Sequence, residues 1–325
     1  MSISIVQLSA GVVALFLGGH YLVQGATRIA LFARLSTAVV GLTVVAMGTS
    51  LPEMAVSVGA AARGVTDLAF ANIVGSTIFN IGAILGITAI VVPISVKRQT
   101  IRLEYPVMLV AAGVVVLLCR DLMVDRLEGA FLFLALILFT AYVVHLSRRD
   151  VAEDEASALD REVKRAARLE GGTGRAWRVS IFLVTGGIIA LVVGADLVVR
   201  GAVTIAHSLG VDERVVGLTV VAMGTSLPEL ATSAVAALQG EKDLALANVI
   251  GSNLFNLLGV LGATALVFPV PLRAASLVDN WVMLGFCLAL FPLMFIGRKV
   301  SRLDGVILVV GLGVYLFYLV LTRGV

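Results

Sequence analysis

One segment of this chain occurs twice without a single change. The residues GLTVVAMGTSLPE occupy 41–53 and return at 217–229, so all 13 letters are repeated. Around them, 41–90 and 217–266 align without a gap and agree at 31 of 50 positions. Apolar helices share letters by chance, but an unbroken identity of this length indicates a duplication. The chain therefore consists of two related halves, and the fold has to accommodate both.

The composition indicates that these halves lie in a membrane. Hydrophobic residues make up 59% of the chain and charged residues only 14%, whereas soluble domains carry about 25% charged residues. Apolar stretches of roughly 20 residues can cross a bilayer as helices. Ten such stretches are predicted: 4–24, 36–62, 68–93, 104–119, 126–146, 178–200, 212–238, 244–270, 277–297 and 304–322. We therefore expect an all-α membrane protein with ten transmembrane helices.

The spans divide into two sets of five. The predicted units are a first five-helix repeat at 1–146, a linker at 147–177, and a second repeat at 178–325. Because five is odd, the second copy enters the membrane from the opposite side, and the repeats are inverted. Inverted repeats are typical of secondary transporters, whose sites lie near the membrane midplane on interrupted helices.

Basic residues predict the orientation, because Lys and Arg accumulate on the cytoplasmic side. With the N-terminus outside, 17 of the 24 Lys and Arg residues fall in inner segments. We expect both termini outside, the linker 147–177 in the cytoplasm as a solvated helix, and the chain in the plasma or inner membrane. Cys119 and Cys287 have no metal-ligand spacing.

The repeated segment breaks its own helix. Proline lacks an N–H and clashes with the carbonyl four residues earlier, so Pro52 and Pro228 free backbone oxygens near the middle of the spans 36–62 and 212–238. The freed carbonyls belong to residues 46–48 and 222–224. Hydroxyl and carboxylate oxygens follow within one turn, from Thr49, Ser50 and Glu53 and from Thr225, Ser226 and Glu229. Oxygen ligands of this kind suit Ca²⁺ and exclude zinc and copper sites, which use His or Cys.

A structural explanation of the glutamates is also available. Ser50 and Glu53 have the S-x-x-E spacing of a helix capping box, in which the acid closes the start of a helix. An acid at the bilayer centre costs roughly 2.5–3.5 kcal/mol on an insertion scale, and two acids in equivalent places are a poor means of capping. Ion binding is favoured, and capping can coexist with it.

A second polar segment follows each glutamate. Ser76 and Asn80 are four residues apart and share one face of a helix, as do Ser252 and Asn256. We predict that these four side chains contribute to the site. Asn72 and Asn248 are open to a second interpretation, a hydrogen bond to a neighbouring helix. Four more polar residues are placed outside the site: Asp67 and Asp243 as helix-start acids, and His20 and Asp196 towards helix ends.

The paired segments G-T-S-L-P-E and N-x-x-G-S-[TN]-x-F-N resemble the α-repeats of the sodium/calcium exchangers. This resemblance implies calcium coordination by the two glutamates and by the backbone of the threonines: Glu53, Glu229, Thr49 and Thr225. It implies sodium ligands at Ala46, Ser50, Ser76, Ala222, Ser226 and Ser252. Potassium-dependent relatives tend to carry acids where Asn80 and Asn256 stand, so potassium transport is not expected. The first helix of each half, 4–24 and 178–200, is the part that slides during transport in such proteins.

We therefore expect an antiporter that exchanges Ca²⁺ for Na⁺, with no cofactor and no nucleic-acid partner, and not an enzyme. The lipid bilayer is its environment and a monomer is the working expectation. Three alternatives are a proton/calcium exchanger of the same fold, a cation channel, and an intramembrane hydrolase on Ser50 or Ser226. No His or Lys lies near either serine in the sequence to activate it.

Overall fold

The computed structural model describes residues 2–149, 172–208 and 222–323, which are almost entirely helical. The first half contains α1 (Ser2–Ala33), α2 (Thr37–Val40), η1 (Gly41–Val45), α3 (Ala46–Thr49), α4 (Leu51–Ala62), α5 (Thr66–Phe79), η2 (Asn80–Leu85), α6 (Gly86–Val91), η3 (Thr100–Glu104), α7 (Tyr105–Leu118), η4 (Cys119–Asp121) and α8 (Arg126–Arg149). The second half contains α10 (Thr173–Ser208), α12 (Ala222–Gly224), α13 (Leu227–Leu238), α14 (Lys242–Leu254), η6 (Phe255–Val260), α15 (Leu261–Val267), α16 (Ala274–Phe295), η7 (Ile296–Arg298) and α17 (Arg302–Arg323).

Within the described part of the chain, eight helices are long and apolar enough to cross a membrane. A ninth candidate is the bent helix formed by Thr37–Thr49 and Leu51–Ala62. The remaining predicted span, 212–238, falls partly outside the described residues, and its described part contains α12 and α13. Most of the linker predicted at 147–177, residues 150–171, also lies outside them. The chain is thus a multi-pass membrane protein, and the segments that the sequence predicts as spans are helical over most of their described length.

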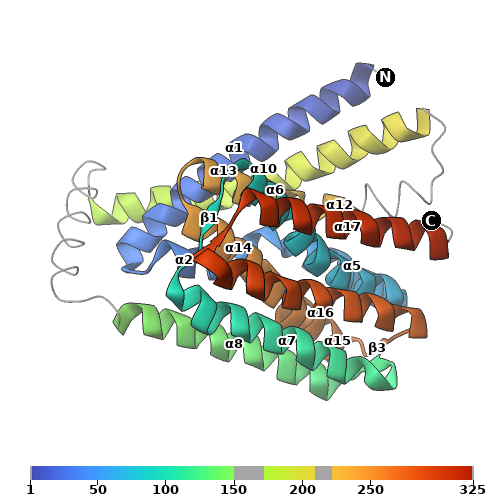
Figure 1. Ribbon diagram of the computed structural model, residues 1–325. Helices are drawn as coiled ribbons and strands as arrows, with labels where there is room; N and C mark the ends of the chain where they lie inside the picture. Colours follow the sequence, from blue (N-terminus) through green and yellow to red (C-terminus); the bar gives the residue numbers. More distant parts are fainter. Residues whose placement is uncertain (1, 150–171, 209–221, 324–325) are drawn as a thin grey trace.

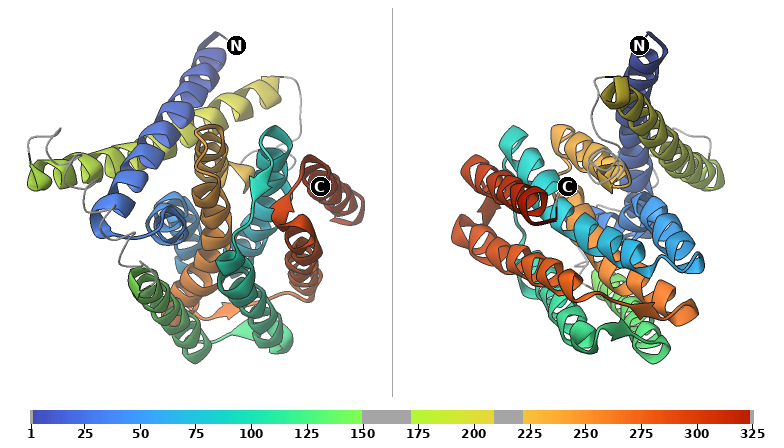
Figure 2. Two further views of the ribbon diagram at one scale, coloured as in Figure 1. Left: turned by 60° about the vertical axis from the view of Figure 1, so that its left-hand side comes forward. Right: turned by 90° about the vertical axis from the view of Figure 1, so that its right-hand side faces the viewer.

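The two longest helices, α1 and α10, lie side by side across one face of the bundle (Figures 1 and 2). Glycines seven residues apart line the contact, and Gly18 faces Gly187 while Gly11 faces Gly194. The others are Gly25 on α1, against Val184, and Gly201 on α10, against Ser4 and Leu8. A Cβ added to Gly18 would lie 2.9 Å from the Gly187 carbonyl oxygen. Only glycine allows two membrane helices to approach this closely.

Two short sheets join the halves of the chain. β1 (Ile94–Ser95) pairs antiparallel with β4 (Lys299–Val300), and β2 (Met123–Val124) pairs antiparallel with β3 (Val270–Pro271). The two pairs are related by the 176-residue offset that separates the two repeats: β1 corresponds to β3, and β4 corresponds to β2. The two sheets are therefore one contact made twice, each time between opposite halves.

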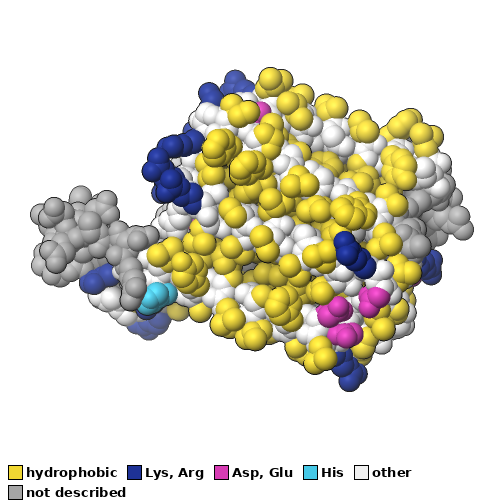
Figure 3. All heavy atoms as spheres, turned by 60° about the horizontal axis from the view of Figure 1, so that its bottom comes forward, with side chains coloured by type: hydrophobic (Ala, Val, Ile, Leu, Met, Phe, Trp, Pro, Cys, Tyr) yellow, Lys and Arg dark blue, Asp and Glu magenta, His cyan; other side chains and the backbone are white. Residues whose placement is uncertain are grey.

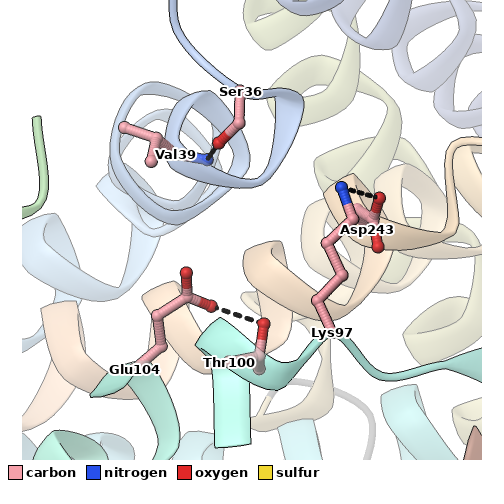
Figure 4. Close-up of polar contacts among 6 residues, drawn as sticks. All are labelled: Ser36, Val39, Lys97, Thr100, Glu104 and Asp243. Atoms are coloured by element: carbon pink, nitrogen blue, oxygen red, sulfur yellow. Dashed lines mark hydrogen bonds and ion pairs between the residues drawn. The ribbon is translucent and has the colours of Figure 1, made fainter. Parts of the chain in front are cut away.

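Ion pairs repeat this symmetry. Lys97 Nζ lies 2.7 Å from Asp243 Oδ2 (Figure 4), and the equivalent pair, Arg273 Nε and Asp67 Oδ2, is separated by 2.6 Å. Both acids lie in the first turn of their helices, α5 and α14, which confirms the sequence prediction. Each acid also binds a base of the opposite half, which sequence spacing did not indicate.

The surface is suited to lipid. Large apolar side chains such as Leu127, Phe182 and Val314 are exposed. Figure 3 shows an apolar expanse between charged side chains, with Lys and Arg gathered at the upper left and acidic side chains lying beside Lys and Arg at the lower right. Exposed apolar surface of this extent marks contact with a membrane or partner.

A candidate cation site between the two halves

The helix that carries Glu53 bends at the site. Ser36 caps its start, since the Ser36 hydroxyl accepts a hydrogen bond from the Val39 N–H at 3.2 Å (Figure 4). The axis then turns by 45° between Thr49 and Leu51, and Pro52 occupies the first turn of α4. The predicted proline break is confirmed in this half.

The second half breaks at the equivalent residue. Ser226 separates α12 from α13 with φ −92° and ψ 4°, close to the −86° and 10° of Ser50. Pro228 again lies in the first turn of the following helix. Both repeats therefore present a serine at the break and a glutamate within the next turn.

The two breaks meet, and their side chains bond across the halves. Ser50 Oγ donates to Glu229 Oε1 at 2.8 Å, and Ser226 Oγ donates to Glu53 Oε1 at 3.0 Å. None of these four residues is more than 1% exposed. Neither serine makes a side-chain cap hydrogen bond to its own helix. The serines thus hold the carboxylates of the opposite half and do not form the capping box that the sequence left open.

Each carboxylate keeps one oxygen without a protein partner. Among the described residues, buried side-chain atoms with no hydrogen bond include Glu53 Oε2 and Glu229 Oε2. The same holds for oxygens of the four other predicted side chains: Ser76 Oγ, Ser252 Oγ, Asn80 Oδ1 and Asn256 Oδ1. A buried polar atom left unpaired costs about 1–3 kcal/mol. Six buried oxygens in this condition, two of them on acids, form a donor set suited to a hard cation.

Irregular helix turns carry the asparagines. α5 changes into the π-helical turn η2 at Asn80, and α14 changes into η6 at Phe255, next to Asn256. π-helical turns are uncommon and often occur at functional sites. The sequence predicted continuous helices here, because no residue type marks a π turn.

Asn72 and Asn248 stabilise the helices that carry the acids. Asn72 Nδ2 donates to Ser57 Oγ at 3.0 Å and to the Glu53 carbonyl at 3.3 Å. Asn248 Nδ2 donates to Ser233 Oγ, the equivalent of Ser57, at 2.9 Å. These contacts match the neighbouring-helix interpretation. Sequence spacing did not indicate a role for Ser57 or Ser233, although serine occupies this equivalent position in both repeats.

The backbone around Ala46 differs from the expectation. Its carbonyl oxygen was expected to be exposed by the break, but it accepts the Ser50 N–H at 3.0 Å and the Thr49 hydroxyl at 3.3 Å. Helical hydrogen bonding continues to Ser50, so the break occurs later than the proline rule suggested.

The equivalent stretch of the second half is bonded differently. Ala222 is the first residue of α12, and Thr225 lies in the turn that follows that helix. The Ser226 N–H donates to the Met223 carbonyl at 3.1 Å, three residues back, whereas the Ser50 N–H reaches back four residues. The two breaks therefore share a backbone shape but differ in their hydrogen bonding.

The remaining polar candidates lie elsewhere. His20 contacts Gln239 at 2.8 Å (Nδ1 to Nε2), and Asp196 pairs with Arg200 on its own helix at 2.7 Å. In the described residues, no group of three or more His, Cys, Asp and Glu side chains could hold a metal ion. Among the described residues, the candidate site therefore has two carboxylates, and its other candidate donors are neutral oxygens.

Comparisons with known proteins point in one direction. The model of the sodium/calcium exchanger protein family matches residues 3–145 and 179–321. The chain is 31% identical over 353 residues to Sodium/calcium exchanger MaX1 of Methanosarcina acetivorans, across 98% of this chain and 100% of that protein. It is 39% identical over 233 residues to Inner membrane protein YrbG of Escherichia coli, across 71% and 70%. A solved structure of the sodium-calcium exchanger NCX_Mj, soaked with zero Na⁺ and Ca²⁺, superposes with a TM-score of 0.82 at 29% identity, covering 98% and 99%.

Proposed function

The chain belongs to the sodium/calcium exchanger family, a family of membrane cation antiporters, and from this premise we propose that it exchanges Ca²⁺ for Na⁺ by alternating access. One observation carries the proposal. Glu53 and Glu229 are both fully buried, and each is bonded by a serine from the opposite half. The site is therefore built from both repeats at once.

Charge explains why exchange would be obligatory. Two ionised carboxylates carry about −2, which one Ca²⁺ or two Na⁺ would balance. Buried charges are tolerated when they are compensated and strongly penalised when they are not. A loaded site can therefore pass through the occluded state, whereas an empty site with both acids ionised resists it. Each direction of movement then requires an ion.

Six of the proposed ligands carry unpaired oxygens, and the resemblance of the repeats to those of the sodium/calcium exchangers supplies the others. Glu53 and Glu229 would bind calcium with the help of Thr49 and Thr225. Sodium ions, which need more donors per unit charge, would add the hydroxyl, amide and backbone oxygens of the following residues: Ser50, Ser76, Asn80, Ala46, Ser226, Ser252, Asn256 and Ala222. The Ala46 carbonyl would have to release one of its two hydrogen bonds in order to bind an ion.

Ten transmembrane helices in two inverted repeats complete the proposal. The strand pairs and ion pairs recur under the same 176-residue shift. The ends of α1 and α17 nearest the termini lie at the same end of the molecule (Figure 1), as an even number of crossings requires. With 1–146 and 178–325 as the repeats, both termini would face outward and 147–177 the cytoplasm, in the cell membrane. No cofactor and no second subunit are required.

Calcium flux into proteoliposomes tests the driving ion. Purified protein is loaded with Na⁺, K⁺ or an acidic interior in separate preparations, and uptake of labelled Ca²⁺ is followed after dilution. We expect uptake only with the sodium gradient and with more than first-order dependence on sodium. Potassium should have no effect, because Asn80 and Asn256 add no charge. Uptake driven by protons alone would assign the alternative coupling, and electrical currents far above carrier turnover would assign a channel.

A further inference from the structure

A buried asparagine that sequence reasoning passed over lies beside the site. Asn253 is on α14, 0% exposed, one residue after the predicted ligand Ser252. Its equivalent in the first half is Thr77, so the repeats differ here within a segment where most letters agree. A polar side chain that is buried in a membrane helix and present in only one repeat needs a specific partner.

Asn253 has two partners, and their chemistry fixes its orientation. Its Nδ2 lies 3.6 Å from the sulfur of Met108, on α7, and its Oδ1 lies 3.0 Å from Asn80 Nδ2. A thioether sulfur can only accept a hydrogen bond. The Asn253 amide must therefore turn its NH₂ towards Met108, which leaves its oxygen facing Asn80.

The orientation of Asn253 in turn fixes the orientation of the Asn80 amide. Because Asn253 presents an oxygen, Asn80 must present its NH₂ in return, and this turns the Asn80 oxygen to the other side of its amide. That oxygen is buried and has no partner among the described residues. Ser76, one turn earlier on α5, also keeps an unpartnered buried oxygen. The series Met108, Asn253, Asn80 thus ends in an oxygen that is free to bind a cation.

The other half lacks this series. Thr77 donates its hydroxyl to the Ile73 carbonyl of its own helix at 2.9 Å. In the described residues, neither the oxygen nor the nitrogen of the Asn256 amide has a hydrogen-bond partner. Among the described residues, no hydrogen bond selects which atom of Asn256 faces the ion.

We propose that Asn253 is a positioning residue that, held by Met108, keeps Asn80 oriented with its oxygen towards the transported cation, so that Asn80 is a preorganised ligand and Asn256 an adaptable one. This inference rests on the proposed function, because it assumes that the buried oxygens bind ions. A preorganised ligand loses less freedom on binding, so its contribution appears in affinity.

The repeats supply the test variant. Asn253→Thr installs the residue that the first half uses, and removes the amide that orients Asn80. We expect the half-saturating concentrations of Na⁺ and Ca²⁺ to rise about five- to tenfold, since one fixed hydrogen bond contributes about 1 kcal/mol. The maximal rate should change less than about twofold. Met108→Leu, a swap of similar volume, should raise the half-saturating concentrations in the same direction by a smaller factor.

A matched control comes from the helix of Met108. Tyr105, on α7, donates its buried hydroxyl to the Cys287 carbonyl at 2.6 Å. Tyr105→Phe removes a buried hydrogen bond outside the site, and should lower thermal stability without changing ion affinity. A purely structural Asn253 would behave like Tyr105.

A double-mutant cycle decides the relation to Asn80. In an Asn80→Ala background, Asn253→Thr should have no further effect on ion affinity, because no amide remains to be oriented. Independent, additive effects would overturn the proposal, as would an unchanged affinity in Asn253→Thr protein that is correctly folded by size-exclusion chromatography.

Calcium binding to detergent-solubilised protein, measured beside transport, separates the two proposals. If uptake proves to be proton-driven, the sodium assignment fails while the calcium affinities still test Asn253. If calcium affinity is altered neither by Glu53→Gln nor by Asn253→Thr, both proposals fail together.

Discussion

The helices α4 and α13 begin with the same Leu-Pro-Glu. In the part of the chain that the structure describes, α1 covers α13, but α10 does not cover α4 in the same way. Val56 on α4 is 38% exposed, whereas its equivalent Thr232 on α13 is 0% exposed. α1 packs against α13 so closely that a Cβ at Gly19 would lie 3.2 Å from the Ala231 carbonyl oxygen. One half is therefore sealed where the other is uncovered.

The polar contacts show the same difference. His20 of α1 contacts Gln239, just beyond the end of α13. In the other half, Asp196 of α10 is equivalent to His20, and Arg63 beyond α4 is equivalent to Gln239. Asp196 binds Arg200 of its own helix, and Arg63 is exposed. The two repeats thus differ in how the first helix packs beside the site, although the serine–glutamate hydrogen bonds at its centre are nearly equal in length. An alternating-access carrier needs this combination. If α1 left α13 and α10 packed against α4, the site would close on the side of α4 and open on the side of α13.

The strongest way to test the equality of the site is to neutralise one acid at a time. Glu53→Gln and Glu229→Gln should each reduce calcium uptake to background, because the remaining carboxylate cannot balance Ca²⁺. Glu104→Gln is the matched control: Glu104 is also buried, but it bonds to Thr100 at 2.9 Å away from the breaks (Figure 4). Normal uptake by either site variant would contradict the symmetric assignment, as would a loss in the control as large as in the site variants.

Cross-linking tests the inequality of the packing. In a background with Cys119 and Cys287 replaced by Ala, cysteines at positions 20 and 239 should be joined by a short bifunctional thiol reagent, since His20 and Gln239 are in contact. The link should hold α1 against α13 and stop transport. The experiment is read by electrophoresis and by calcium uptake before and after reaction.

The equivalent pair predicts the opposite state. Cysteines at 196 and 63 should cross-link only when α10 packs against α4, so the yield should rise under ion gradients that favour the other access state. Asp196 would then leave Arg200 and approach Arg63. A yield that never responds to ions would show that the two halves do not exchange their packing.

The smallest effect is expected at the two ends, where the halves are joined by equivalent ion pairs. Asp243→Asn and Asp67→Asn remove one partner each, from Lys97 and from Arg273. Both pairs are partly exposed, and such pairs contribute about 0.2–1 kcal/mol. Each variant should lower thermal stability slightly and equally, with transport changed less than about twofold. A large transport loss at only one end would assign that pair a role in gating.

Much of the fold could be predicted because membrane helices follow from local composition. Every predicted span is helical over most of its described length, and the break near Pro52 follows from the missing N–H of proline. The extent of hydrogen bonding at Ala46 and the π turns at Asn80 and Asn256 could not be predicted. Both depend on how a helix adapts to its neighbours, and no residue type encodes that adaptation.

The sequence alone determined the duplication, the membrane setting and the chemistry of the donors, because residue order and side-chain type are sufficient for each. Only the tertiary structure decided which groups meet. Ser50 and Glu229 are 179 residues apart and Ser226 and Glu53 are 173 apart, and the pairing of Asn80 with Asn253 also spans 173 residues. The covering of α13 by α1, which α10 does not repeat on α4 within the described ranges, likewise has no sequence signature. Such contacts arise from the packing of whole helices against each other, and two nearly identical segments can therefore lie in different surroundings within one chain.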